Sequence, residues 1–260
     1  MYHKKSLGQN FLIDYEIVDE IIRAGEISLE DKVLEIGPGK GFLTDSLINQ
    51  AGQVLAVEKD EQLSEFCQNQ FKADNFKVIT GDVLDLDWQE ILKQHNFLQY
   101  KLIANIPYYI TGKILRLFLE NSFQPEILVL MVQKEVAQRI CEKPGRLGIL
   151  SLSVQYFGKP EIVKIVTKEK FDPMPEVDSA ILKIRVDDEN RLSPENEKKF
   201  FRLVKMGFSN PRKTLVNNLS AGLHQEKSKI KKILDKISLE ENVRAQALRI
   251  DDWKKLISYF

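Results

Sequence analysis

The 260-residue chain has few of the residues that build metal centres, disulfide frameworks and charge-relay hydrolases. It contains two cysteines, Cys67 and Cys141, and three histidines, His3, His95 and His224. Because these residues lie far apart in the sequence, they predict no metal centre and no Ser-His-Asp hydrolase. Two cysteines in helix-like surroundings indicate reduced thiols, which are typical of a cytoplasmic protein.

Long hydrophobic runs are also missing. No stretch approaches the ~18 consecutive apolar residues that would predict a membrane span. The first ten residues are partly basic but lead into no apolar segment, so we expect no secretory signal and a cytoplasmic location. The remaining composition, 43% hydrophobic and 29% charged, is ordinary for a globular protein with one large domain and a smaller one.

A net charge of zero conceals an uneven distribution. Residues 1–186 carry 22 basic and 27 acidic side chains, and residues 187–189 add three acids. Residues 190–260 carry 16 basic and 8 acidic side chains, a charge of +8. This basic C-terminal part predicts an anionic partner such as nucleic acid, although a solvated helical surface has the same composition.

The hydrophobic pattern alternates between strands and helices over most of the chain. This alternation predicts an α/β fold with a doubly wound, mostly parallel Rossmann-like sheet, followed by a small helical domain. Domains are expected at 1–187 and 188–260, with an acidic linker between them. Strands are expected at 32–36, 54–57, 76–80, 100–104, 127–132, 162–166 and 180–186, and helices at 15–24, 42–50, 61–71, 114–119, 147–156, 194–208, 212–219, 228–237 and 251–259.

Three polar features follow the first three predicted strands. A glycine loop, Gly37-Pro38-Gly39-Lys40-Gly41, comes after the first strand, Glu58 ends the second, and Asp82 follows the third. In open α/β sheets, ligands bind where parallel strands end. Glu58 can accept hydrogen bonds from two ribose hydroxyls and Asp82 from an adenine amine, although either is also compatible with a surface or turn carboxylate. Together they favour a nucleoside-bearing cofactor.

The glycine loop is not a phosphate-binding loop. It lacks the G-x-x-x-x-G-K-[ST] pattern, which argues against an ATPase, and Pro38 removes one backbone donor. A cofactor with a sulfonium and an amino-acid tail suits this loop better than a dinucleotide does.

The next strand runs into Asn105-Ile106-Pro107-Tyr108. The Asn105 oxygen and the Ile106 carbonyl can accept hydrogen bonds from an exocyclic amine, while Pro107 restricts the backbone. Tyr108 offers a ring on which a base can stack. The four residues alone are more typical of a strand followed by an ordinary X-Pro turn, so the motif gains weight only from the rest of the chain.

Taken together, these motifs resemble the class I S-adenosylmethionine-dependent methyltransferases, and within them the small-subunit rRNA adenine N6,N6-dimethyltransferase family. The resemblance covers nearly the whole chain. It rests on the segments 5–12, 35–41, 57–58, 81–82, 105–110, 171–180 and 208–215. The pair Asn210-Pro211 departs from the family pattern, in which polar or basic residues are more common, and we expect it to bend the start of the following helix.

The resemblance implies S-adenosyl-L-methionine as methyl donor and no metal. It also implies methylation of two adjacent adenosines in the 3′-terminal hairpin of small-subunit rRNA, by a monomer that acts on a small ribosomal subunit precursor. The cofactor-binding residues expected on this basis are Gln9, Asn10, Leu12, Gly37, Gly39, Glu58, Lys59, Asp82, Val83 and Asn105.

The target base is expected to leave its helix and bind beside the Asn105-Ile106-Pro107-Tyr108 motif. Tyr108 would stack on one face of the base, and Phe171 is the candidate for the other face, although packing beside Pro173 and Pro175 explains Phe171 equally well. The candidate RNA-binding residues are Arg139, Arg146, Arg212 and Lys213.

Three other functions remain open from the sequence. One is methylation of a single adenosine in large-subunit rRNA, and another is a ribosome-assembly or transcription factor that performs no catalysis. The third is a nicotinamide-dependent dehydrogenase.

Overall fold

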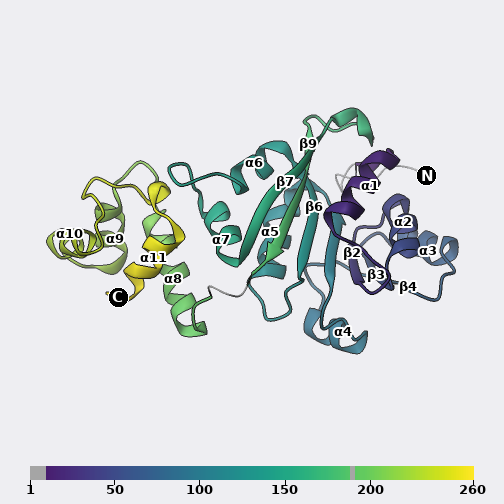
Figure 1. Cartoon of the computed structure of the whole chain (residues 1–260), viewed down its shortest axis with the longest axis horizontal. Coiled ribbons are helices and arrows are strands. Elements are labelled where there is room, and N and C mark those ends of the chain that lie inside the picture. The colour runs from purple at the N-terminus through teal and green to yellow at the C-terminus, as the bar shows by residue number, and fades with distance from the viewer. Residues whose placement is uncertain (1–9, 188–190) are drawn as a thin grey trace. The chain divides into compact units, whose positions relative to one another are not determined.

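The computed structural model describes residues 10–187 and 191–260 and divides the chain into two compact units (Figure 1). The first unit contains the described residues of Met1–Ala137 and Lys159–Val186. The second contains those of Gln138–Gly158 and Asp187–Phe260.

The segment Gln138–Gly158 was expected to belong to the N-terminal domain, but by its contacts it groups with the C-terminal helices. Aromatic packing explains this grouping. The Tyr156 ring lies 4.6 Å from the Phe200 ring, and the Phe157 ring stacks on Phe201 at 5.5 Å. The functional division at residue 187 stays a prediction, since packing does not show which residues share a function.

A seven-stranded sheet forms the centre of the first unit. Its strand order is β4-β3-β2-β5-β6-β9-β7. The five strands from β4 to β6 are parallel, and β9 is antiparallel to β6, so the predicted mostly parallel sheet is confirmed. The strands are β2 (Lys32–Ile36), β3 (Gln53–Glu58), β4 (Phe76–Thr80), β5 (Lys101–Asn105), β6 (Ile127–Gln133), β7 (Gly158–Val166) and β9 (Ser179–Val186).

One face of this sheet is covered by α1 (Tyr15–Ala24) and α2 (Phe42–Gln50). Successive strand residues point to opposite faces, so alternate residues of each strand meet the same helices. Val33, Val54 and Ile103 from three strands lie in one buried cluster with Ile21 of α1 and Leu47 of α2.

Side-chain caps set the start of several helices. Asp14 accepts a hydrogen bond from the Ile17 nitrogen at 3.2 Å, and Asp60 accepts one from the Gln62 nitrogen at 3.0 Å. Helices α4 and α6 were not predicted, because each has only seven residues and little apolar periodicity. The other α-helices before strand β7 are α3 (Glu61–Gln70), α4 (Trp88–Gln94), α5 (Thr111–Leu119), α6 (Lys134–Ile140) and α7 (Ile149–Phe157).

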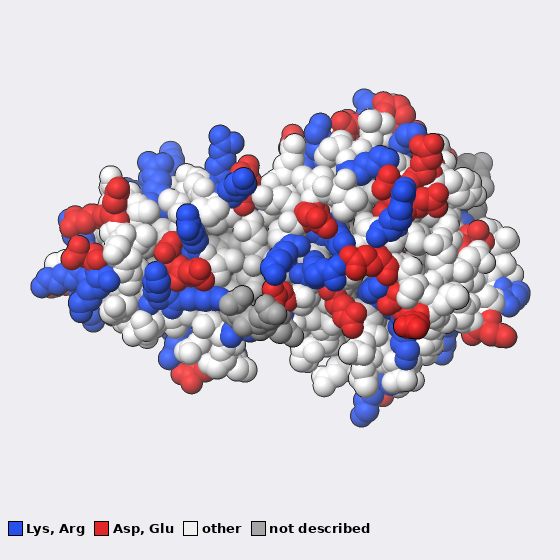
Figure 2. All heavy atoms as spheres, in the orientation of Figure 1, with Lys and Arg blue, Asp and Glu red and all other residues white. Residues whose placement is uncertain are grey.

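The second unit is helical in its C-terminal part, as predicted. Its helices are α8 (Pro194–Gly207), α9 (Leu215–Leu223), α10 (Lys227–Lys236) and α11 (Ile250–Ile257). Helix α9 begins at Leu215 and not at the predicted Arg212, because Thr214 caps it by accepting a hydrogen bond from the Asn217 nitrogen at 3.4 Å. Figure 2 shows lysine and arginine side chains over these helices, interspersed with acidic ones.

A second, two-stranded sheet was not foreseen. Strand β1 (Phe11–Leu12) pairs antiparallel with β8 (Phe171–Asp172). The pairing joins segments that lie about 160 residues apart in the chain. Among the helices within the described ranges, none is long and apolar enough to cross a membrane.

The turn between α2 and β3 provides a test of backbone packing. A Cβ atom at Gly52 would lie 2.3 Å from the Leu29 carbonyl oxygen, so the backbone would have to shift. We expect Gly52→Ala to lower the free energy of unfolding by about 1–3 kcal/mol. At Gly112, in α5, a Cβ would meet nothing within 4 Å. Gly112→Ala is therefore the matched control, expected to stabilise by about 0.5–1 kcal/mol. Urea unfolding of the two variants checks the difference, and equal effects would contradict it.

Candidate active site

A pocket of about 240 Å³ opens at the carboxyl ends of β2, β3, β4 and β5. Since these strands are parallel, the residues that follow them meet at one edge of the sheet. Most of the predicted site residues line this pocket. They are Asn10, Leu12, Gly37, Gly39, Glu58, Lys59, Asp82, Val83, Asn105, Ile106, Pro107 and Tyr108.

The glycine loop turns sharply between β2 and α2. Gly37 has a φ of +71° and donates a backbone hydrogen bond to the Val57 carbonyl at 2.9 Å. At Gly39, φ is +59° and a Cβ atom would lie 2.8 Å from the Phe11 ring. The loop therefore needs glycine at Gly39 both for its backbone conformation and for its approach to Phe11.

Lys40 of the same loop faces the β1–β8 sheet. Its ammonium lies 4.7 Å from the centre of the Phe11 ring and 4.0 Å from a carboxylate oxygen of Asp172. These contacts bring the N-terminal strand against the glycine loop, although both groups of the ion pair are partly exposed and such pairs stabilise little.

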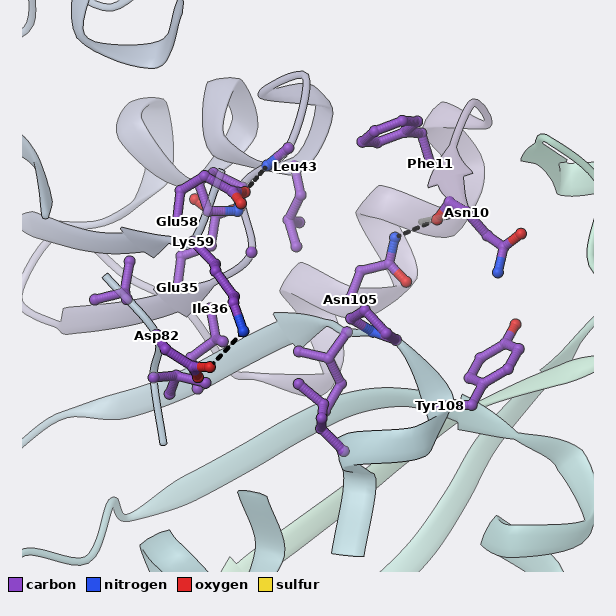
Figure 3. A pocket seen from close by; sticks show the side chains of 18 of the residues that line it. Asn10, Phe11, Glu35, Ile36, Leu43, Glu58, Lys59, Asp82, Asn105 and Tyr108 are labelled. Carbon is purple, nitrogen blue, oxygen red and sulfur yellow. Dashed lines mark hydrogen bonds and ion pairs between the residues drawn. The ribbon is translucent and has the colours of Figure 1, made fainter. Parts of the chain in front are cut away.

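Glu58 ends β3 and is buried, with 6% of the residue exposed. One oxygen accepts a hydrogen bond from the Gly39 nitrogen at 3.1 Å, and the other accepts one from the Asp60 nitrogen at 2.9 Å. Burial raises the pKa of Glu58 above its ordinary value, and these backbone hydrogen bonds oppose the rise only in part. The carboxylate is thus held rigidly against the glycine loop (Figure 3).

Glu35 also lines the pocket, although the sequence analysis assigned it no role. The residue is 1% exposed, and its carboxyl accepts a hydrogen bond from the Thr44 hydroxyl at 2.8 Å. Burial raises the pKa of Glu35 to about 8, with a smaller contribution from Glu58. The sequence did contain a signal for Glu35, because an acidic residue within a mostly apolar strand is unusual and indicates a special role.

Asp82 and Lys59 form an ion pair at the β3–β4 side of the pocket. The Lys59 ammonium lies 2.6 Å from one oxygen of Asp82, and the other oxygen accepts a hydrogen bond from the Leu84 nitrogen at 3.0 Å. The hydrogen bond from Lys59 is the largest cause of the lowered pKa of Asp82. Asp82 is therefore a carboxylate at neutral pH, with both oxygens able to accept hydrogen bonds.

Asn105 lies between the two ends of the pocket. Its side-chain nitrogen donates a hydrogen bond to the Asn10 carbonyl at 3.3 Å. This bond fixes the orientation of the amide, so the oxygen points away from Asn10 (Figure 3). Among the described residues, the Asn105 oxygen receives no hydrogen bond and remains available as an acceptor.

Tyr108 stands on the far side of Asn105 from Asp82 (Figure 3). Its hydroxyl and that of Ser179 lie 2.6 Å apart and share a hydrogen bond. Burial raises the pKa of Tyr108, and Ser179 itself is fully buried. The sequence analysis noted Ser179 only within a motif, whereas the structure shows that it anchors the Tyr108 ring.

Some predicted residues lie elsewhere. Phe171 does not line the pocket, because it is 3% exposed and packs in the core cluster with Leu12 and Val166. Gln9 lies outside the described residues. The four candidate RNA-binding residues belong to the second unit and are exposed; they are Arg139, Arg146, Arg212 and Lys213.

Arg212 and Lys213 lie on a turn instead of a helix. The Asn210 side chain accepts a hydrogen bond from the Arg212 nitrogen at 3.2 Å, and its carbonyl accepts one from the Lys213 nitrogen at 3.0 Å. Helix α9 therefore begins after this turn, at Leu215, and the expected bend at its start stays a prediction. Within residues 10–187 and 191–260, no group of three or more His, Cys, Asp or Glu side chains is arranged to hold a metal.

The raised pKa of Glu35 predicts a pH-dependent stability. Its folded-state pKa of about 8 exceeds the ordinary 4.5, so the stability that its neutral form contributes is complete below about pH 4.5. That stability is lost as the pH rises towards about 8. Glu35→Gln stays neutral, so its advantage over the wild type should grow by up to about 1.4 kcal/mol per pH unit in this window.

Urea unfolding at pH 5, 7 and 8.5 measures this difference. Glu61→Gln, at an exposed position of the same unit, controls for the loss of one carboxylate. An advantage of Glu35→Gln that is the same at all three pH values would contradict the assignment.

The comparisons with known proteins agree with this geometry. Residues 2–260 match the family described as ribosomal RNA adenine dimethylase. A ribosomal RNA small subunit methyltransferase A of Dehalococcoides mccartyi is 43% identical over 97% of this chain and 87% of its own length. The protein of the same name from Fusobacterium nucleatum is 41% identical, with 99% and 97% covered.

Two solved structures share the whole fold. A dimethyladenosine transferase from Plasmodium falciparum has a TM-score of 0.80 at 26% identity and covers 96% of this chain and 97% of its own. The 23S rRNA methyltransferase ErmE has a TM-score of 0.77 at 25% identity, with 96% and 98% covered. The chain belongs to the ribosomal RNA adenine dimethylase family.

Proposed function

We propose that the chain is an S-adenosylmethionine-dependent rRNA adenine N6,N6-dimethyltransferase. Its proposed substrate is small-subunit rRNA within a small ribosomal subunit precursor, where it methylates two adjacent adenosines of the 3′-terminal hairpin. The names of the relatives from Dehalococcoides mccartyi and Fusobacterium nucleatum support the small subunit as the target. Action as a monomer stays a prediction.

The pocket suits S-adenosylmethionine in the chemistry of its donors and acceptors. Glu58 offers buried carboxylate oxygens for the ribose hydroxyls, and Asp82 offers one for the adenine amine. Gly37 and Gly39 let the backbone approach the amino-acid end of the cofactor. When bound, the cofactor supplies an electrophilic methyl group whose bond to sulfur breaks as the new carbon–nitrogen bond forms.

The orientation of Asn105 is the observation that carries the proposal. Because the amide nitrogen is engaged by Asn10, the oxygen is presented as an acceptor for the N6 amine of the target adenosine. The Ile106 carbonyl, next along the chain, provides the second acceptor. Two acceptors on one amine draw electron density towards nitrogen and stabilise the positive charge that develops there during transfer, by roughly 3 kcal/mol for each well-placed group.

Two further parts of the reaction are the binding of the target base and the loss of a proton from the methylated amine. The Tyr108 ring, anchored through Ser179, offers a stacking surface for a base that has left its helix. After transfer the amine nitrogen carries an extra proton, which leaves to water. A strong base close to the amine is not needed, in keeping with the absence of a histidine among the described lining residues.

The competing functions predict different products and ligands. Large-subunit methylation, as the name of ErmE indicates for that protein, gives modified 23S rRNA and leaves the small-subunit hairpin unmodified. A dehydrogenase would be stabilised against heat by NAD and not by S-adenosylmethionine. A non-catalytic assembly factor would bind RNA without transferring methyl groups.

The direct test is transfer of radiolabelled methyl groups to undermethylated small subunits, followed by identification of the product nucleosides. The wild type should yield N6,N6-dimethyladenosine. Asn105→Ala should lower kcat by about 100-fold or more, because it removes an acceptor for the developing charge.

Glu58→Ala should weaken cofactor binding by more than about tenfold and leave RNA binding nearly unchanged, because the loss of a buried acceptor unpairs the ribose hydroxyls. Urea unfolding of Glu58→Ala controls for collapse of the glycine loop, which the Glu58 carboxylate contacts through the Gly39 nitrogen. Full activity of Glu58→Ala would refute the ribose assignment, and labelled large-subunit rRNA would refute the proposed substrate.

The RNA contact is tested through its salt dependence. If Arg212 and Lys213 each neutralise one phosphate, the double variant Arg212→Ala/Lys213→Ala should reduce the slope of log K against log salt by about two. The control is Lys198→Ala/Lys199→Ala, which removes two exposed positive charges from the same unit. Filter binding between 50 and 300 mM salt (about the range in which such slopes are linear) measures both. Equal slopes for the two double variants would contradict a specific role for Arg212 and Lys213.

A further inference from the structure

Two consecutive tyrosines occupy the short 3₁₀ helix Tyr108–Ile110 at the pocket, and their environments differ. Tyr108 is half-buried and shares a hydrogen bond with Ser179. Tyr109 also lines the pocket, but 64% of its surface is exposed. Within the described residues Tyr109 makes no hydrogen bond and stacks on no other ring, so neither packing nor polar contacts account for an aromatic side chain at this position.

The geometry of the 3₁₀ helix separates the two rings. With three residues per turn, neighbouring side chains project about 120° apart. Tyr108 is directed towards Ser179, on the side of Asn105 opposite Asp82 (Figure 3). Tyr109 must therefore face a different part of the pocket from the one that holds the target base.

Charge interactions show which part that is. The Lys59 ammonium has its pKa raised mainly by its hydrogen bond to Asp82, and Tyr109 contributes to the same rise. Lys113, four residues after Tyr109, also lines the pocket. The pKa of Asp82 is lowered mainly by its hydrogen bond from Lys59, and the charge of Lys113 adds to this effect. Tyr109 thus shares the lining of the pocket with Lys59, Asp82 and Lys113, and it lies near enough to the Lys59 ammonium to act on its charge.

We propose that Tyr109 forms the aromatic wall of the subsite for the adenine ring of the methyl donor. Asp82 would accept from the exocyclic amine at the edge of the ring, while the exposed face of Tyr109 stacks on its plane. The apolar side chains of Val83 and Leu84, which line the same side of the pocket, suit the opposite face of the ring. The inference rests on the proposed function and adds to it a residue that the family resemblance did not assign.

This assignment divides the two adjacent aromatic residues between two purines. Tyr108 serves the adenosine that receives the methyl group, and Tyr109 serves the adenosine moiety of the donor. The alternative role for an exposed ring is stacking on a base of the rRNA, which would change the affinity for RNA and leave the affinity for the cofactor unchanged.

The experiment compares Tyr109→Ala, Tyr109→Phe and the wild type. Calorimetry measures binding of S-adenosylhomocysteine and of 5′-methylthioadenosine, which keeps the adenosine part but lacks the amino acid. Tyr109→Ala should weaken both ligands by the same factor, about tenfold, because the lost contact is to adenine. Tyr109→Phe keeps the ring and should bind both within about twofold of the wild type. In methyl-transfer assays, the KM for S-adenosylmethionine should rise by a similar factor, with kcat nearly unchanged.

Leu98→Ala is the matched control for truncation of an exposed apolar side chain, because Leu98 is 76% exposed and does not line the pocket. It should alter neither affinity. Wild-type affinity of Tyr109→Ala for both ligands would overturn the inference, and a raised KM for rRNA in that case would assign Tyr109 to the RNA. A loss for S-adenosylhomocysteine alone would also overturn it, since the contact would then be to the amino-acid end. If the wild type bound neither ligand, the proposed function itself would fall, and the role of Tyr109 with it.

Discussion

The parallel register of β2 with β3 and β5 is the constraint on which the site depends. Ile36, the last residue of β2, is paired with Val57 on one side and with Ala104 on the other. The three strands therefore end at the same level, and the glycine loop, Glu58 and Asn105 begin there together. Slippage of any of these strands by one residue would turn its side chains to the opposite face of the sheet and take the polar group out of the pocket.

Three carboxyl groups line the pocket, those of Glu35, Glu58 and Asp82. They differ in burial, in hydrogen-bond partners and in pKa. Glu58 accepts hydrogen bonds from two backbone N–H groups, which partly offset the rise in its pKa caused by burial. Glu35 accepts one from the Thr44 hydroxyl, and its pKa is raised to about 8. Asp82 is more exposed and has Lys59 beside it, so its pKa is lowered. One pocket therefore holds a carboxyl that is neutral at pH 7 and a carboxylate that is charged. Such a separation lets the same site accept hydrogen bonds without accumulating negative charge in its interior.

The N-terminal strand contributes to the site from far away in the sequence. Strand β1 pairs with β8, and its Phe11 ring covers Gly39 while the Asn10 carbonyl orients Asn105. The glycine loop, the N-terminal strand and the catalytic amide are thus parts of one contact network. A change in any of the three would alter the orientation of the Asn105 oxygen, because this network contains the hydrogen bond from the Asn105 amide to the Asn10 carbonyl.

The sequence by itself determined the seven strands of the main sheet, most of the helices and about half of the residues that line the pocket. Strand ends, glycines with positive φ and caps such as Asp60 depend on local chemistry, so Glu58, Asp82 and Asn105 could be found from spacing and from the family resemblance. Only the tertiary structure decided that Phe171 packs in the core, that Glu35 is buried at the pocket, and that 138–158 groups with the C-terminal helices. The reason is that burial and contacts between distant segments depend on how whole elements pack. The spacing of residues along the chain predicts only local structure, such as the helix or strand to which a residue belongs and the face that it occupies.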